Sequence, residues 1–276
     1  MNKILTILLI TLLVFSATSV FLAKAQASNS DIEKLVFIHY KKGSGKPPVE
    51  ILKCEEPNTL DIAKELYINK GAGLQTIAKL KTPKCYTFLT PTKVKWKTLP
   101  VNYVINPKNP VQQLDENQVI SAIYNAAEEW DSHTSVELMN DQYTIDYSAI
   151  PGVQDYKNVV GFGNYSDPDV IAVTTVWYSR ATNQIVEFDM MLDTDWIWGD
   201  AAAQCNSNET FTNSTCTIMD IQNIATHEFG HAIGLGDIYD SSCSEVTMYG
   251  YSEYGEVKKR TLEQPDIIGL QALYGA

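Results

Sequence analysis

The sequence predicts an α+β fold, mainly because of the order of its hydrophobic patterns. A short strand pattern is followed by an amphipathic helix, then by several segments rich in β-branched and aromatic residues, and finally by two more helices. Strands and helices gathered in separate blocks are typical of α+β proteins. With 276 residues, 45% of them hydrophobic, the chain can bury an ordinary core.

Residues 1–27 have the pattern of a secretory signal peptide. Lys3 precedes an apolar run from Ile4 to Leu22, and Ala25-Gln26-Ala27 offers a small-residue cleavage site after it. The run also approaches the length of a membrane span, so an uncleaved anchor is the alternative. We expect cleavage and a secreted protein. A cell-surface protein in contact with the membrane would follow only if this segment were retained.

Residues 28–90 form an N-terminal segment of mixed character that could be a propeptide. Lys34 to Tyr40 predicts a strand, and Asp61 to Leu80 has a weak helical pattern interrupted by glycines. A connector rich in Pro and Lys runs from Lys81 to Pro100 and suggests the boundary. We therefore assign residues 91–276 to a second domain.

The second domain begins with a short strand at Val101–Ile105. Asp115, with Gln118 three residues later, signals the start of a helix that runs through Trp130. Four further strands are expected at Ser135–Met139, Asn158–Gly163, Val170–Tyr178 and Gln184–Leu192. Two helices complete the domain, one from about Met219 to Gly234 and one introduced by Pro265.

The charge balance argues against a nucleic-acid partner. The chain has 21 Lys and Arg against 33 Asp and Glu, for a net charge of −12, whereas binding a phosphate backbone requires a basic face. The five cysteines are too few for a disulfide scaffold, but disulfides persist outside the cytoplasm. Cys205 and Cys216 flank a polar stretch and are the best candidates for a pair, because the bridge would close a flexible loop.

The most specific motif is His227-Glu228-Phe229-Gly230-His231. Histidines four residues apart lie on one face of a helix, so both imidazoles can bind one metal ion. Glu228 would then project beside the metal, where a carboxylate can take a proton from bound water. An accidental pair on a solvated helix is the alternative.

Two residues downstream extend this motif. Gly234 could end the helix in a left-handed conformation, and the bend would bring Asp237 back to the same metal. Two imidazoles and one carboxylate leave a fourth position for water, which is typical of a catalytic zinc site.

His227-Glu228-x-x-His231-x-x-Gly234-x-x-Asp237, followed by Met248, resembles the metzincin signature and its Met-turn. Within metzincins, the segments Trp96–Pro107 and Asp266–Gly275 are similar to matrixin catalytic domains. The resemblance implies a zincin-like fold, in which a twisted mixed sheet lies above an active-site helix and a C-terminal helix. It also implies a zinc endopeptidase, with Asp237 in the place of the usual third histidine.

The resemblance also assigns roles around the metal. One catalytic zinc is expected, with Glu228 as general base and Met248 as an apolar floor beneath the metal. Gln184–Leu192 resembles the edge strand along which such enzymes bind an extended peptide or protein substrate. Asp193, Asp195 and Asp200 could bind calcium, although a solvated acidic loop is the preferred interpretation.

Cys54, Cys85 and Cys243 are an odd number, so at least one is a free thiol or pairs outside the chain. Pro83-Lys84-Cys85 partly resembles the matrixin propeptide motif, in which a cysteine binds the catalytic zinc, but Tyr86 replaces the glycine of that motif. A Cys54–Cys85 disulfide is the preferred alternative to such a latency cysteine.

Two further alternatives remain open. Glu253 or Glu256 could replace Asp237 as third ligand, and the domain could bind zinc without catalysing a reaction. The remaining histidines, His39 and His133, are expected to be ordinary residues. The patterns predict neither substrate specificity nor an oligomeric state.

Overall fold

The computed structural model describes residues 31–46, 84–205 and 216–276. The predicted signal peptide, the helical pattern at 61–80 and Cys54 lie outside these ranges. The strands are β1 Ile32–Lys41, β2 Thr87–Phe88, β3 Val104–Ile105, β4 Thr144–Ile145, β5 Val159–Gly163, β6 Val170–Ser179, β7 Gln184–Asp193, β8 Ile197–Gly199, β9 Ile218–Asp220, β10 Leu235–Gly236 and β11 Tyr251–Ser252. The helices are α1 Glu116–Asp131, α2 Ala201–Cys205, α3 Ile221–Ala232 and α4 Gln264–Tyr274.

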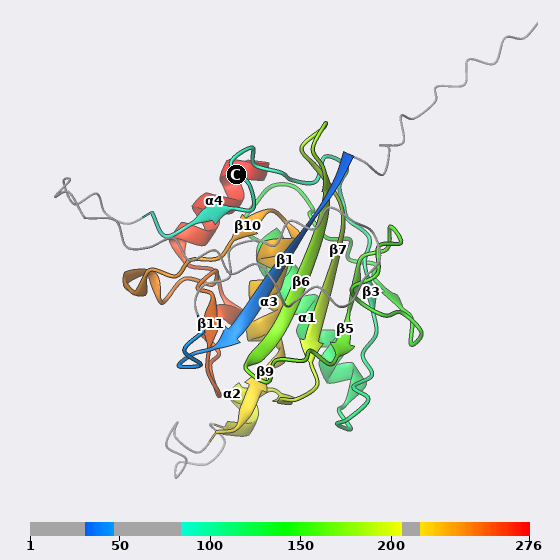
Figure 1. Ribbon diagram of the computed structural model, residues 1–276, viewed down its shortest axis with the longest axis vertical. Helices are drawn as coiled ribbons and strands as arrows, with labels where there is room; N and C mark the ends of the chain where they lie inside the picture. The colour runs from blue at the N-terminus through cyan, green and yellow to red at the C-terminus, as the bar shows by residue number, and fades with distance from the viewer. Residues whose placement is uncertain (1–30, 47–83, 206–215) are drawn as a thin grey trace, which may run out of the picture.

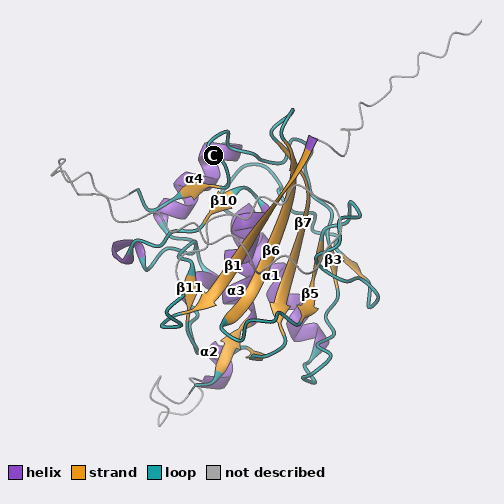
Figure 2. Ribbon diagram, in the orientation of Figure 1, coloured by secondary structure: helices purple, strands orange, loops and turns teal. Residues whose placement is uncertain are grey.

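Within the described ranges, seven strands form one mixed sheet in the order β11-β1-β6-β7-β5-β3-β4 (Figure 1). The long central strands cross in front of α1 and α3, which lie together behind the sheet (Figure 2). This arrangement agrees with the predicted α+β class. No helix in the described ranges is both long enough and apolar enough to cross a membrane.

Helix α1 forms where its cap and apolar stripe predict it. The Asp115 carboxylate accepts hydrogen bonds from the backbone N–H groups of Asn117 and Gln118 and so caps the helix. The opposite end is fixed by Trp130, whose indole N–H donates to the Thr226 carbonyl in α3 at 2.8 Å. This bond and the buried apolar face of α1 hold α3 against the sheet.

Two strand predictions are corrected. Residues 135–139 do not form a strand: Leu138 and Met139 donate their backbone N–H groups to the Asp131 carboxylate, and the segment makes only an isolated parallel bridge from Met139 to Val101. The Gln184–Leu192 strand exists as β7, but it is not an edge, because β5 pairs with one side of it and β6 with the other.

The predicted strand at Lys34–Tyr40 is confirmed, and it lies inside the main sheet. β1 pairs antiparallel with β6 along its whole length and parallel with β11 through Tyr40 and Lys41 (Figure 1). The N-terminal segment therefore contributes a strand to the same sheet as the second domain.

Two cysteine expectations are also corrected. Cys85 is bonded to Cys243, with 5.4 Å between their Cα atoms, so neither the Cys54–Cys85 pair nor a free Cys85 or Cys243 thiol is present. The pairing follows from the fold, because β2, directly after Cys85, pairs with β10 near Cys243. Cys205 and Cys216 form the disulfide that the sequence favours.

Three carboxylates on β7 bind backbone groups of neighbouring loops. Glu187 accepts from Asp155 and Tyr156 N–H, and Asp189 accepts from Gly152, Val153 and Val159 N–H. Asp193 accepts from Tyr165 N–H at 2.6 Å and Asp195 N–H at 2.7 Å.

These contacts bear on the possible calcium site. Asp193 is already engaged with backbone donors, and Asp200 forms an ion pair with Arg260 at 2.6 Å. Neither residue, nor Asp195, belongs to a metal-binding cluster in the part of the chain described. The structure therefore adds no support for calcium at these acids.

Because of the buried Asp189 carboxylate, we expect the free energy of unfolding to fall as the pH rises. Burial raises the pKa of Asp189 to about 8, and the charge of Glu187 adds to that shift, whereas an aspartate in the unfolded chain has a pKa of about 3.9. The folded state therefore holds this proton more tightly, and its contribution to stability is lost between pH 4 and 8. We expect a higher thermal midpoint at pH 5.5 than at pH 8, and a smaller difference in Asp189→Asn. Equal slopes in the two proteins would contradict this assignment.

Candidate metal centre

Helix α3 carries the histidine motif and is buried along nearly its whole length. It starts at Asp220, whose carboxylate accepts from Asn223 N–H at 2.8 Å, which satisfies a donor at the helix end. Arg260 donates to the same carboxylate and to Asp200. This ion pair fixes the start of the helix and therefore the height of the histidines beneath the sheet.

Three predicted ligands meet at one point. Asp237 Oδ1 lies 3.2 Å from His227 Nε2 and 3.4 Å from His231 Nε2. His227 and His231 are 0% and 1% exposed, and the Asp237 side chain is 7% exposed. This site therefore combines two imidazole nitrogens and one carboxylate oxygen in a buried setting, which suits zinc.

Backbone carbonyls orient both imidazoles. His227 Nδ1 bonds to the Thr247 carbonyl at 2.7 Å, and His231 Nδ1 bonds to the Leu235 carbonyl at 2.9 Å. In each ring Nδ1 must then carry the hydrogen, which leaves the Nε2 lone pair facing Asp237. Burial lowers the pKa of His227 to about 4, so its neutral form prevails at neutral pH.

The unsatisfied polar atoms support a metal at this point. His227 Nε2 and Asp237 Oδ1 are buried and have no hydrogen-bond partner, although an orphaned buried polar atom is costly. Although burial opposes it, the two imidazoles hold the pKa of Asp237 well below its usual range, so the carboxylate is charged. A divalent cation would satisfy all three groups, and the residues fit zinc.

Glu228 lies beside these ligands and is 0% exposed. Its Oε2 accepts from the Thr174 hydroxyl of β6 at 2.5 Å, and its Oε1 has no hydrogen-bond partner. Burial raises the pKa of Glu228 to about 7, although His231 and the Thr174 bond oppose that shift. A carboxylate with a pKa near neutrality is suited to accept and return a proton.

The floor of the site depends on a glycine in the helix. Gly230 leaves space for Met248, since a Cβ at this position would overlap the Met248 sulfur and lie 2.9 Å from Trp130 Cζ2. Met248 is fully buried and packs against Gly230 of α3. Gly234 has φ +117, and a Cβ there would lie 2.7 Å from the Val94 carbonyl oxygen. The predicted bend after α3 is therefore present.

Replacing Gly230 with Ala is expected to lower the free energy of unfolding by about 1–3 kcal/mol, because the added methyl overpacks a closed core. Combining it with Met248→Ala should cost less than the two single changes together, since the methionine is what the methyl meets. Chemical denaturation of the four proteins measures this coupling. Simple additivity would show that the two side chains do not compete for one space.

Residues 95–275 match the model of the matrixin family. This chain belongs to the matrixin family. It is 26% identical over 207 residues to the hatching enzyme of Paracentrotus lividus and 26% identical over 208 residues to human neutrophil collagenase. It is also 26% identical over 206 residues to metalloendoproteinase 2-MMP of Arabidopsis thaliana. These alignments cover 71–73% of this chain but only 30%, 39% and 47% of the three relatives, in that order.

The structure of this matrixin does not favour the alternative third ligands. Glu253 forms an ion pair with Lys42 at 2.9 Å, and Glu256 bonds to Ser252 at 3.1 Å. Neither belongs to a cluster with His227 and His231 among the described residues.

Several residues near the site of this matrixin escaped the sequence reasoning. Tyr239 donates its hydroxyl to Asp237 Oδ2 at 3.0 Å and orients the carboxylate. His39, expected to be ordinary, lies with Nδ1 3.4 Å from Glu228 Oε1, and its ring centroid is 4.1 Å from that of His227. His133, by contrast, lies partly exposed on α1's end and bonds to Glu129. Only the β-strand pattern around His39 hinted that it would be buried.

Proposed function

We propose that this matrixin is a zinc-dependent endopeptidase. His227, His231 and Asp237 would hold one zinc ion, and Glu228 would be the general base. The observation that carries the proposal is the convergence of three buried ligand atoms beside a buried carboxylate oxygen that has no hydrogen bond. The relatives named as a collagenase and a metalloendoproteinase support it.

Bound zinc would supply Lewis acidity toward a water molecule and the scissile carbonyl. The chain's own residues would do the rest. Glu228 Oε1 would accept the proton of that water and later deliver it to the leaving amine. Thr174, which donates to the other oxygen, would hold the carboxylate in place. The carbonyl bonds to His227 and His231 would keep both rings aimed at the metal.

The proposal extends to processing and location. We propose that residues 1–27 are a signal peptide, that residues 28–90 act as a propeptide and that residues 91–276 hold the catalytic residues. The two disulfides fit an oxidising compartment, and the protein would be secreted or displayed at the cell surface. Its substrates would be peptides or proteins that reach this compartment.

Zinc stoichiometry and peptide-library cleavage together test the proposal. We expect one zinc ion per chain. In Phe37→Asp with His39→Ala, which removes two β1 side chains that pack on His231 and His227, we expect cleavage of internal peptide bonds that stops after chelation and returns when zinc is added. A non-catalytic zinc-binding module would bind the metal without any cleavage in this variant.

A further inference from the structure

The proposed catalytic residues have no route to solvent in this structure. His227 and Glu228 are 0% exposed and His231 is 1% exposed. An endopeptidase must place an extended peptide directly over these groups. The residues that cover them therefore decide whether a substrate can enter.

The cover is β1. It lies between β6 and β11 and passes across α3 (Figure 1). Extended peptides bind proteins by adding a strand to a sheet edge. If β1 were absent, β6 would present such an edge beside Glu228, which accepts a hydrogen bond from Thr174 of that strand. β1 thus occupies the backbone N–H and C=O groups of β6 with which a peptide substrate would pair.

The register places the middle of β1 over the catalytic groups. Phe37 pairs with Thr174, the residue that bonds to Glu228, and the Phe37 ring stacks on His231 with a centroid distance of 4.2 Å. His39, on the same face of the strand, lies beside His227 and Glu228. The backbone between these two residues therefore runs where a scissile bond would have to lie.

A buried polar network holds His39 in place. His39 Nε2 bonds to the Ser252 hydroxyl at 3.0 Å, and Lys259 Nζ donates to the same hydroxyl at 2.9 Å. Ser252 also bonds to Glu256 at 3.1 Å, and Lys259 is fully buried. His39 Nδ1 has no hydrogen-bond partner and faces the space next to Glu228 Oε1. The Ser252 hydroxyl therefore holds the His39 ring beside Glu228.

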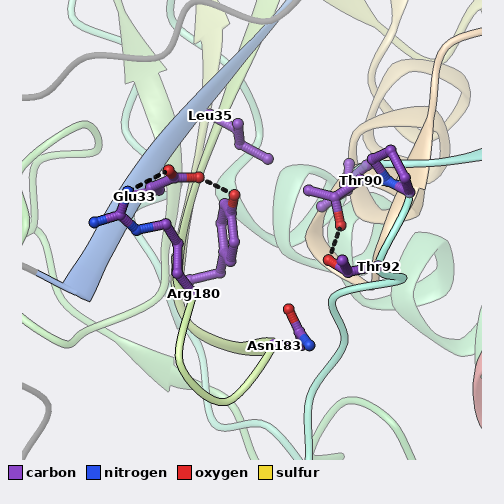
Figure 3. Close-up of a pocket in the computed structure, with 9 residues that line it drawn as sticks. Glu33, Leu35, Thr90, Thr92, Arg180 and Asn183 are labelled. Atoms are coloured by element: carbon purple, nitrogen blue, oxygen red, sulfur yellow. Dashed lines mark hydrogen bonds and ion pairs between the residues drawn. The ribbon is translucent and has the colours of Figure 1, made fainter.

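Ion pairs join both ends of β1 to neighbouring segments. Glu33 pairs with Arg180 at 3.3 Å, at the border of a cavity of about 330 Å³ that is open to solvent (Figure 3). Lys42, just after the strand, pairs with Glu253 at 2.9 Å, and both side chains are 54% exposed. Exposed ion pairs contribute little stability, so these two pairs add little to the backbone hydrogen bonds that join β1 to β6.

We propose that β1 is a self-inhibitory strand that occupies the place of an extended peptide substrate and is anchored by His39. The inference rests on the proposed peptidase function. In this proposal His39, and not Cys85, is the residue that keeps the enzyme latent, because Cys85 is held in a disulfide.

Four zinc-loaded proteins test the inference. They are the unmodified full chain, the single variant His39→Ala, the double variant Phe37→Asp with His39→Ala, and His133→Ala as a histidine control outside the site. Hydrogen exchange of the β6 amides reports strand detachment without any catalysis. A short peptide ending in a hydroxamate reports access to the metal. In the two variants with a substituted β1 we expect the β6 amides to exchange faster. We also expect the affinity for the hydroxamate and the rate of peptide cleavage each to rise by about tenfold or more. His133→Ala should behave like the unmodified chain.

Separate outcomes identify separate failures. If the unmodified chain binds the hydroxamate and cleaves peptides as well as the double variant does, β1 is not inhibitory, although the peptidase function stands. If β6 exchanges faster and the hydroxamate binds, but no peptide is cleaved, the strand inference stands and the peptidase function fails. If the double variant loses its near-ultraviolet circular dichroism, Ser252→Ala takes its place. This change removes the hydroxyl that holds His39 without substituting any residue of β1.

Discussion

Replacing Glu228 with Gln is expected to lower kcat for peptide cleavage by about 100- to 10,000-fold, the range that a positioned general base supplies. The amide cannot accept the water proton, but it has nearly the same shape and can still accept from Thr174. Zinc stoichiometry and the thermal midpoint should therefore change little. The comparison is made in a chain that carries His39→Ala, so that the substrate reaches the site.

Glu187→Gln is the matched control, because Glu187 of β7 is also fully buried but accepts hydrogen bonds from the backbone N–H groups of Asp155 and Tyr156 and belongs to neither metal-binding cluster of the described residues. It should retain the kcat of its parent chain. If Glu228→Gln kept near-normal turnover, with a contaminating protease excluded by purification, another residue would have to be the base.

Asp237→Ala is expected to weaken zinc binding by about 100-fold or more. Residues that only orient a metal ligand typically contribute 10- to 100-fold in affinity, and Asp237 is placed to bind the metal itself. The change also leaves His227 Nε2 and His231 Nε2 facing an uncharged space. Competition with a chromophoric chelator measures the affinity directly.

Asp240→Ala provides the control, since Asp240 lies three residues away and only caps the short turn at Ser241–Cys243. It should bind zinc as the unmodified chain does. Tight zinc binding in Asp237→Ala would instead show that the third ligand lies elsewhere and would remove the Asp237 part of the proposal.

The histidine motif was predictable because helix geometry is local. His227 and His231 share a face of α3 whatever surrounds them. Gly234 allows the bend after α3, because few other residues adopt its positive-φ backbone conformation. The cap of α1 at Asp115 follows from equally short-range bonds. The resemblance to metzincins suggested that Met248 forms a floor beneath the metal, but its packing against Gly230 joins distant segments and came only from the structure.

The sequence by itself determined the matrixin signature, the α+β class and the strand character of residues 34–40. Only the tertiary structure decided that this strand inserts between β6 and β11, that His39 lies against Glu228 and that Cys85 pairs with Cys243. The physical reason is the range of the interactions. Helix and strand patterns depend on neighbours a few residues apart, whereas the partner of a strand or a cysteine depends on which distant segments pack together.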